Sequence, residues 1–141
     1  MSKKSVTILV GTPGSGKTWV ANQIRDTHTV VDHDVHGLDN AESYASAIAN
    51  HARTSTKPVV AEAPFSLSKL QAALAQRGLE AKPVFIAESV ATTKQRYEAR
   101  EGKPIPQGHL TRIETFRQRA REQSAPIGTA QEVLDYLRKN K

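Results

Sequence analysis

One stretch near the N-terminus combines glycines with a lysine and a threonine at a spacing suited to phosphate binding. Residues 11–18 read GTPGSGKT and fit the pattern G-x-x-x-x-G-K-[ST] at every fixed position. Glycines let the backbone curl around an anion, and successive N–H groups then point inward. Lys17 would reach the β- and γ-phosphates of a nucleotide, and the Thr18 hydroxyl would ligate Mg²⁺. The pattern predicts a nucleoside triphosphate site whose remaining loop residues are Thr12, Pro13, Gly14, Ser15 and Gly16.

The segments on either side of this motif have the character of a strand and a helix. Residues 6–10 form an apolar, β-branched run, which is typical of a buried strand. From residue 17 to about 27, Val20, Ala21 and Ile24 fall on one face of a helix. The alternative is a glycine turn with a chance lysine, but a strand, a loop and a helix together favour phosphate binding.

Two later strands are expected to end in acidic residues. The strand at residues 29–34 ends in Asp32, His33 and Asp34, and Glu62 ends the next strand. In a parallel α/β sheet, the C-terminal ends of the strands face the ligand. A carboxylate there can accept a proton from an acceptor hydroxyl or help to hold Mg²⁺. The alternatives are an ordinary Asp-rich turn and a solvated glutamate.

Strand and helix patterns alternate along the first ninety residues, which predicts an α/β fold. We expect a three-layer α/β/α sandwich with a parallel sheet, and 141 residues suit a single domain over residues 1–141. The expected order is strand 6–10, helix 17–27, strand 29–34, helix 41–53, strand 59–61, a helix from Ser66 or Ser68 to about 77, and strand 83–87.

After the fourth strand, the sequence predicts two basic helices joined by a stiff, proline-bracketed turn. The first, at residues 90–101, carries Arg96 and Arg100 on one face. The turn spans residues 103–108, and a second helix with an apolar stripe follows. Such a pair has the build of a lid, at about residues 90–121, whose arginines would stabilise the charge on a transferring phosphoryl group. The alternative is a solvated basic face.

The positive charge of the chain is concentrated in this predicted lid. The formal net charge is +6, from 20 Lys and Arg against 14 Asp and Glu. Residues 94–121 contain eight basic and three acidic side chains, which leaves +5 in this segment. That concentration favours a phosphate-rich partner such as nucleic acid, although a basic nucleotide-binding enzyme is the alternative.

Composition and the two ends of the chain limit the remaining possibilities. Cysteine is absent, which excludes disulfides, thiolate metal sites and cysteine nucleophiles. No apolar run approaches the roughly 18 residues of a membrane span, and the first strand follows Met1 too closely for a signal peptide. We expect no membrane partner and a cytoplasmic location, in the host if a phage encodes the chain. Thr129 to Glu132 form a capping box that predicts a closing helix.

Over nearly its whole length, the chain resembles the kinase module of phage polynucleotide kinases, within the wider group of small P-loop kinases. The loop at residues 11–18 looks like that family's loop, and residues 95–100, followed by Pro-Ile-Pro, resemble its lid. The resemblance implies ATP and Mg²⁺ as cofactors and Asp34 as the general base. It also implies that Arg96 and Arg100 hold the ATP phosphates.

At other positions the resemblance is partial. Glu62 stands where the family has a functional strand-end aspartate, and residues 35–37 lack the arginine that grips the nucleic-acid phosphate there. The sequence also shows none of the phosphatase domain that often accompanies such kinases. Related phage kinases phosphorylate the hydroxymethyl group of 5-hydroxymethyluracil in DNA. The expected acceptor is therefore that group or a 5′-hydroxyl end, with acceptor contacts from Asp32, His33 and His36.

Two other functional classes stay open at this point. A kinase of small molecules, acting on a nucleoside, a nucleotide or a sugar, would use the same parts but would not need a strongly basic lid. A nucleotide-binding switch without catalysis would need neither an acceptor site nor a general base.

Overall fold

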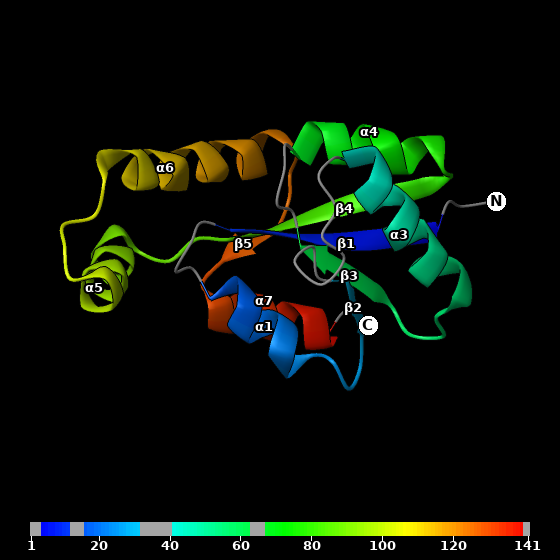
Figure 1. Cartoon of the computed structure of the whole chain (residues 1–141), viewed down its shortest axis with the longest axis horizontal. Coiled ribbons are helices and arrows are strands. Elements are labelled where there is room, and N and C mark those ends of the chain that lie inside the picture. Colours follow the sequence, from blue (N-terminus) through cyan, green and yellow to red (C-terminus); the bar gives the residue numbers. More distant parts are fainter. Residues whose placement is uncertain (1–3, 12–15, 32–40, 63–66, 140–141) are drawn as a thin grey trace.

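A parallel sheet with helices on both faces organises the chain (Figure 1). The computed structural model describes residues 4–11, 16–31, 41–62 and 67–139. The elements in these residues are β1 (Lys4–Gly11), α1 (Lys17–Gln23), β2 (Thr29–Val31), α3 (Ala41–Thr54), β3 (Val59–Glu62), α4 (Leu67–Gln76), β4 (Leu79–Ile86), α5 (Val90–Glu101), α6 (Gln107–Glu122), β5 (Ile127–Gly128) and α7 (Ala130–Lys139). The predicted alternation of strands and helices is confirmed.

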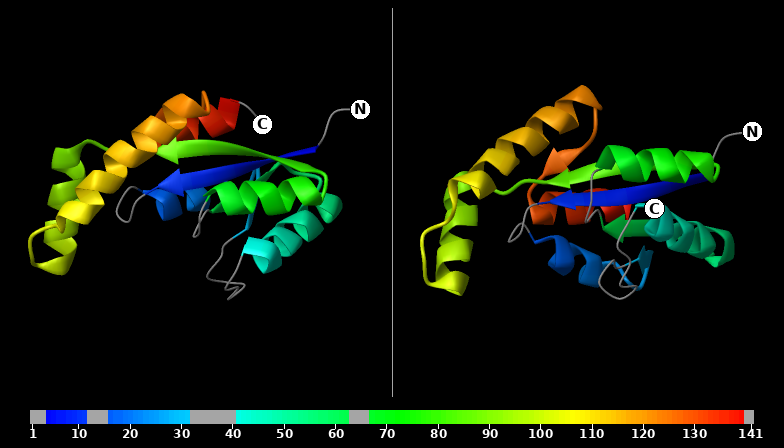
Figure 2. Two further views of the ribbon diagram at one scale, coloured as in Figure 1. Left: turned by 90° about the horizontal axis from the view of Figure 1, so that it is seen from above. Right: turned by 45° about the horizontal axis from the view of Figure 1, so that its top comes forward.

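The strands lie in the order β2-β3-β1-β4-β5, and every neighbouring pair is parallel. All five therefore end at the same edge of the sheet, the edge towards which α5 projects (Figure 2). The chain leaves β1 towards one side of the sheet and leaves β3 towards the other. Parallel sheets bind their ligands at such a reversal, beyond the C-terminal ends of the strands.

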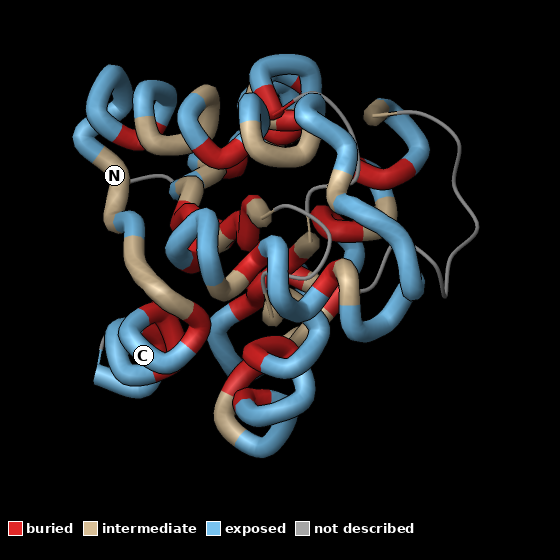
Figure 3. The backbone as a smooth tube through the Cα atoms, turned by 90° about the vertical axis from the view of Figure 1, so that its left-hand side faces the viewer, coloured by how far each residue is buried: buried red, intermediate tan, exposed pale blue. Residues whose placement is uncertain are grey.

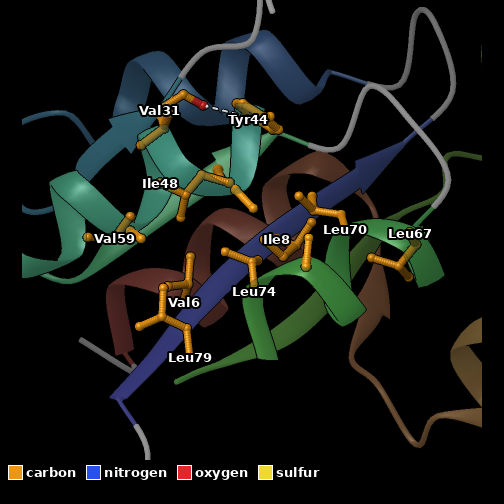
Figure 4. Packing of buried hydrophobic residues seen from close by; sticks show 14 of the residues in the cluster. Val6, Ile8, Val31, Tyr44, Ile48, Val59, Leu67, Leu70, Leu74 and Leu79 are labelled. Atoms are coloured by element: carbon orange, nitrogen blue, oxygen red, sulfur yellow. Dashed lines mark hydrogen bonds between the residues drawn. The ribbon is translucent and has the colours of Figure 1, made fainter. Parts of the chain in front are cut away.

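Helices α3, α4 and α6 lie on one face of the sheet, and α1 and α7 lie on the other (Figure 1). The central strand β1 is buried on both faces, as its continuous apolar sequence predicts. Val6 and Ile8 join the cluster under α3 and α4 (Figure 4), whereas Leu9 joins the cluster under α1 and α7. Seen from the end of the sheet that carries α5, buried backbone is concentrated between the helices (Figure 3).

The sequence patterns place β4 and α1 incorrectly at one end each. We expect the fourth strand to begin at Pro83, but β4 begins at Leu79. Phe85 donates its N–H to Pro126, on the β5 side, so residue 83 faces the same side two positions earlier. Because β5 covers only the end of β4, the missing N–H of Pro83 costs the sheet no hydrogen bond. Helix α1 ends at Gln23 rather than near residue 27.

The predicted helix at residues 90–101 and the predicted capping box of the closing helix are confirmed. Ser89 caps α5 by accepting the N–H of Thr92, and Gly102 ends it with φ 70°. The capping box of α7 is reciprocal, because Thr129 donates its N–H to Glu132 and Glu132 donates its N–H to the Thr129 hydroxyl. The backbone hydrogen bond from Thr129 lowers the pKa of the Glu132 carboxyl. No helix among the described residues is both long and apolar enough to cross a bilayer.

A buried tyrosine joins the ends of two strands to the helix between them. Tyr44, on α3, is fully buried. Its hydroxyl lies 3.1 Å from the carbonyl oxygen of Val31, where β2 ends (Figure 4), and 2.6 Å from that of Glu62, where β3 ends. These carbonyl groups lie at the C-terminal edge of the sheet. Tyr44 therefore holds the end of β2, at Val31, and the end of β3, at Glu62.

We predict that Tyr44→Phe lowers the free energy of unfolding by about 1–2 kcal/mol, because two buried carbonyl groups lose a shared donor. Denaturant unfolding of the purified protein measures this change. Tyr97→Phe is the matched control, because the Tyr97 ring is also buried but its hydroxyl makes no hydrogen bond within the described residues. Equal losses in the two variants would contradict the role given to the Tyr44 hydroxyl.

A candidate nucleotide-binding site

The glycine that precedes α1 has a conformation and surroundings that exclude other residues. Gly16 has φ 98°, in the left-handed region that favours glycine. A Cβ at this position would lie 2.8 Å from the Cβ of Ala130, at the start of α7. The last glycine of the predicted loop is thus required both by its backbone and by its packing. Thr12, Pro13, Gly14 and Ser15 lie outside the described residues.

The first turn of α1 presents the polar residues of the motif beside Gly16. Lys17 is half-buried and Thr18 is exposed. Gly16 is the N-cap of the helix and, having no side chain, leaves the first-turn N–H groups to other acceptors. Among the described residues near this edge, Thr18 and Glu62 carry oxygen ligands of the kind that Mg²⁺ prefers, and they could help to hold it.

A cavity of about 560 Å³ lies beside this turn, within the size range of small-ligand sites. It is formed where α1, the end of β4, the lid helix α5 and the start of α7 meet, and its lining residues are Gly16, Trp19, Glu88, Arg96, Thr129, Ala130 and Gln131. The Trp19 side chain is 43% exposed. A large exposed indole next to a phosphate-binding motif offers a flat apolar surface to an aromatic ligand.

The two predicted lid arginines have different surroundings. Arg96 lines the cavity, and its Nη1 lies 3.7 Å from Oε1 of the buried Glu88. Arg100 instead pairs with Glu101 at 3.0 Å, and its guanidinium lies 5.7 Å from the ring centre of Tyr97. The structure therefore brings Arg96 to the same cavity as Gly16 and leaves Arg100 outside the cavity lining.

The lid itself is a helical hairpin with its own internal contacts. The rings of Tyr97 on α5 and His109 on α6 meet edge to face at 5.1 Å. Glu98 accepts the N–H of Ile105 at 3.3 Å, which holds the turn against α5. At its other end α6 packs on the sheet, where Phe116 lies 6.0 Å from Phe85 between ring centres. Only the outer part of the lid projects beyond the strand ends (Figure 2).

Glu62 is the last residue of β3 and stands level with Leu9 of β1. Since β1 and β3 are the strands from which the chain departs in opposite directions, Glu62 lies where the topology favours ligand binding. The other predicted acidic and histidine positions, Asp32, His33, Asp34 and His36, lie outside the described residues.

A second hollow, of about 660 Å³, lies near the opposite end of the sheet. Its lining includes Ser5 and Glu80, close to the starts of β1 and β4, and residues along the open edge of β4. Of the predicted phosphate-binding residues that the structure describes, Gly16, Lys17 and Thr18, none lines this hollow. We therefore assign the candidate site to the smaller cavity beside Gly16.

Trp19 and Glu88 were not predicted from the sequence as site residues. Trp19 does carry a signal, because it lies off the apolar stripe of its helix and therefore has to be exposed. Glu88 follows an expected strand, as Glu62 does, and that position is a signal that could have found it. Its burial carries no signal in the sequence, because it depends on the approach of α7.

Comparison with known proteins places the fold but no family. No family model matches the chain, and no curated protein sequence matches it either. Among solved structures, it is similar to a tunicamycin resistance protein from Deinococcus radiodurans, with a TM-score of 0.66 and 16% identity over 97% of this chain and 95% of that one. A gluconokinase from Sinorhizobium meliloti 1021 gives a TM-score of 0.54 and 18% identity, over 96% and 90% of the two chains.

A chain of the Pnkp1/Rnl/Hen1 RNA repair complex is also similar, with a TM-score of 0.59 and 21% identity. The match covers 87% of this chain and 47% of that one. At such identities these likenesses concern the fold. The chain has the α/β fold of P-loop kinases, and the predicted parallel sheet with helices is confirmed. Its fifth strand in the described residues, β5, was not predicted from the sequence.

We predict that Gly16→Ala destabilises the protein by about 1–3 kcal/mol and weakens nucleotide binding, because of its left-handed φ and the contact with Ala130. Thermal unfolding and a nucleotide titration measure the two effects. Adding Ala130→Gly should recover part of the lost stability by removing the contact, but not the part due to φ. Gly108→Ala is the control, because a Cβ there meets nothing within 4 Å. A Gly16→Ala variant as stable as Gly108→Ala would contradict this account.

Proposed function

We propose that the chain is an ATP- and Mg²⁺-dependent kinase that transfers the γ-phosphate to a hydroxyl group carried by DNA. The observation that carries the proposal is a convergence of two predicted parts. Gly16, the last glycine of the predicted phosphate-binding motif, and Arg96 of the predicted lid line one cavity, although eighty positions separate them in the sequence. A site that binds phosphate between a loop and a lid arginine suits phosphoryl transfer.

The nucleotide donor would bind along the loop and the first turn of α1. Lys17 and the loop amides would hold the β- and γ-phosphates, and Thr18 would ligate Mg²⁺. When bound, the metal ion would neutralise charge on the phosphates. The nucleobase would lie in the cavity, where the exposed indole of Trp19 favours stacking on an aromatic ring.

The acceptor would approach from the adjoining strand ends. We assign to Asp34 the role of orienting and deprotonating the acceptor hydroxyl, with acceptor contacts from Asp32, His33, His36 and Glu62. Arg96 and Arg100 would then close over the γ-phosphate. For Arg100 this requires leaving its contacts with Glu101 and Tyr97, which a lid that closes on its ligand permits.

The charge of the lid supports a polyanionic acceptor. From Val90 to Glu122 the lid contains eight basic and four acidic side chains. Glu101 and Glu114 are engaged with neighbouring arginines, and Glu98 accepts a backbone N–H. The exposed basic residues of this segment are Lys94, Arg96, Arg100, Lys103, Arg112, Arg119 and Arg121. Similarity to a chain of an RNA repair complex agrees with a nucleic-acid acceptor.

A small-molecule kinase is the second candidate, favoured by the similarity to a gluconokinase over nearly the full length of both chains. The two candidates differ in their response to salt. Binding of DNA by a basic lid weakens steeply as the salt concentration rises, because the counterions that binding releases then gain less free energy. Binding of a small neutral acceptor shows little such dependence. A non-catalytic switch would differ from both, because its ATP turnover would not depend on an acceptor.

We predict that adding Mg²⁺ and ATP changes the fluorescence of Trp19, which is the only tryptophan in the chain. Lys17→Met should weaken the apparent affinity by roughly tenfold or more, because a phosphate contact to a charged donor is lost. Lys57→Met is the matched control, since Lys57 is an exposed lysine outside the cavity. An unchanged titration in Lys17→Met would refute the assigned donor site.

We predict that the acceptor is a DNA hydroxyl and that transfer depends on Asp34. Transfer of γ-³²P is measured to 5′-hydroxyl oligonucleotides, to 5′-phosphorylated duplex containing 5-hydroxymethyluracil, and to free nucleosides and nucleotides. Label at internal positions of the blocked duplex identifies a base-hydroxymethyl kinase, and label at 5′-hydroxyl ends identifies an end kinase. Label only on the free compounds would overturn the nucleic-acid proposal.

Asp34→Asn tests the general base in the same assay. It should abolish transfer while leaving the Trp19 titration with ATP close to that of the wild type, because a base acts on the acceptor and not on the donor. Near-normal transfer by Asp34→Asn would show that another group accepts the proton.

A further inference from the structure

Glu88 is a buried carboxylate that the proposed reaction does not yet use. It follows the end of β4, one residue before the cap of the lid helix α5, and it is 9% exposed. A carboxylate in such a place is costly to bury unless it is paired and hydrogen-bonded. The partners of Glu88 should therefore indicate why this residue is present.

One oxygen of Glu88 has partners on two other elements. Glu88 Oε1 accepts the N–H of Ala130, the first residue of α7, at 3.0 Å. The same oxygen lies 3.7 Å from Nη1 of Arg96, on the lid. The α7 backbone therefore holds the carboxylate in place on one side, and the carboxylate presents a fixed negative charge to the lid arginine on the other.

Arg96 gains most from a fixed partner, because it lines the cavity and its side chain is half exposed. A guanidinium has five N–H donors in a planar fork, so a contact with Glu88 through Nη1 does not by itself use them all. An exposed arginine without such a partner samples many rotamers, and ordering them costs free energy each time a ligand binds. A preorganised guanidinium stabilises developing charge without that cost.

We propose that Glu88 is a positioning residue that orients Arg96 towards the phosphoryl group in transfer. The inference rests on the proposed kinase function and adds to it a connection from the start of α7 to the lid. Ala130 connects Glu88 to Gly16. Its N–H donates to Glu88, and its Cβ lies beside Gly16. A role confined to capping α7 is the competing explanation.

Glu88→Gln separates these two roles. The amide oxygen of glutamine still accepts the Ala130 N–H, but the charge that holds Arg96 is gone. We expect kcat to fall on the order of tenfold, KM for ATP to change by less than about twofold, and the thermal midpoint to stay close to that of the wild type. Glu98→Gln is the matched control, because Glu98 lies on the lid and also accepts a backbone N–H.

A double-mutant cycle tests whether Glu88 acts through Arg96. If it does, Glu88→Gln adds little to the loss already caused by Arg96→Gln. Effects on kcat that multiply, or a kcat for Glu88→Gln equal to that of Glu98→Gln, would overturn the proposal. A fall in thermal midpoint with unchanged kcat would do so as well, and would leave only the capping role.

The double-mutant cycle of Glu88→Gln and Arg96→Gln can also be measured by ligand binding, without phosphoryl transfer. If the wild-type protein transfers phosphate to none of the acceptors, the proposed function fails, and the same four proteins are titrated by Trp19 fluorescence with Mg²⁺, ADP and aluminium fluoride, which together mimic the phosphoryl group in transfer. Non-additive changes in the dissociation constant would still support the positioning of Arg96 by Glu88. Additive changes would overturn it independently of the kinase assignment.

Discussion

The close approach of α1 and α7 at Gly16 is the constraint on which the arrangement of the site depends. A methyl group on Gly16 would lie 2.8 Å from the Cβ of Ala130, so only a glycine allows the two helices to begin side by side. Because α7 begins with Ala130 beside Gly16, the Ala130 N–H can reach Glu88. Glu88 in turn lies beside Arg96. The absence of a side chain at Gly16 therefore allows a short series of contacts between the predicted phosphate-binding motif and the predicted lid. The series runs from Gly16 through Ala130 and Glu88 to Arg96.

The parallel sheet explains why residues distant in sequence can share a site. All strands end at one edge, and the order β2-β3-β1-β4-β5 places the end of β1 between the ends of β3 and β4. Glu62 is the last residue of β3, and Glu88 lies two residues after the end of β4. The buried hydroxyl of Tyr44 holds the ends of β2 and β3 together from the side of α3. The polar groups are therefore positioned by apolar elements that are themselves rigidly packed.

Most of the fold could be predicted, because residues 6–10 of β1 form a largely apolar run and the helices carry clear stripes and caps such as Ser89 and Gly102. The start of β4 could not, because Glu80 and Lys82 are exposed and Pro83 resembles a strand start until the open edge of the sheet is known. In the site, Gly16 and Arg96 could be predicted from a motif and a helical spacing. The burial of Glu88 could not, since it depends on the distant residue Ala130. The role of Asp34 stays a prediction.

The lid is encoded by one uninterrupted segment whose two ends join β4 and β5, which are neighbours in the sheet. Its two helices contact each other through Tyr97 and His109, and its connection to the body is limited largely to the end of α6. Such a segment can be replaced as a unit by another segment. The replacement changes the chain at only two points, the end of β4 and the start of β5, which lie side by side. If the proposed function holds, replacement of this single contiguous stretch would change the acceptor preference and leave the donor site and the sheet unchanged.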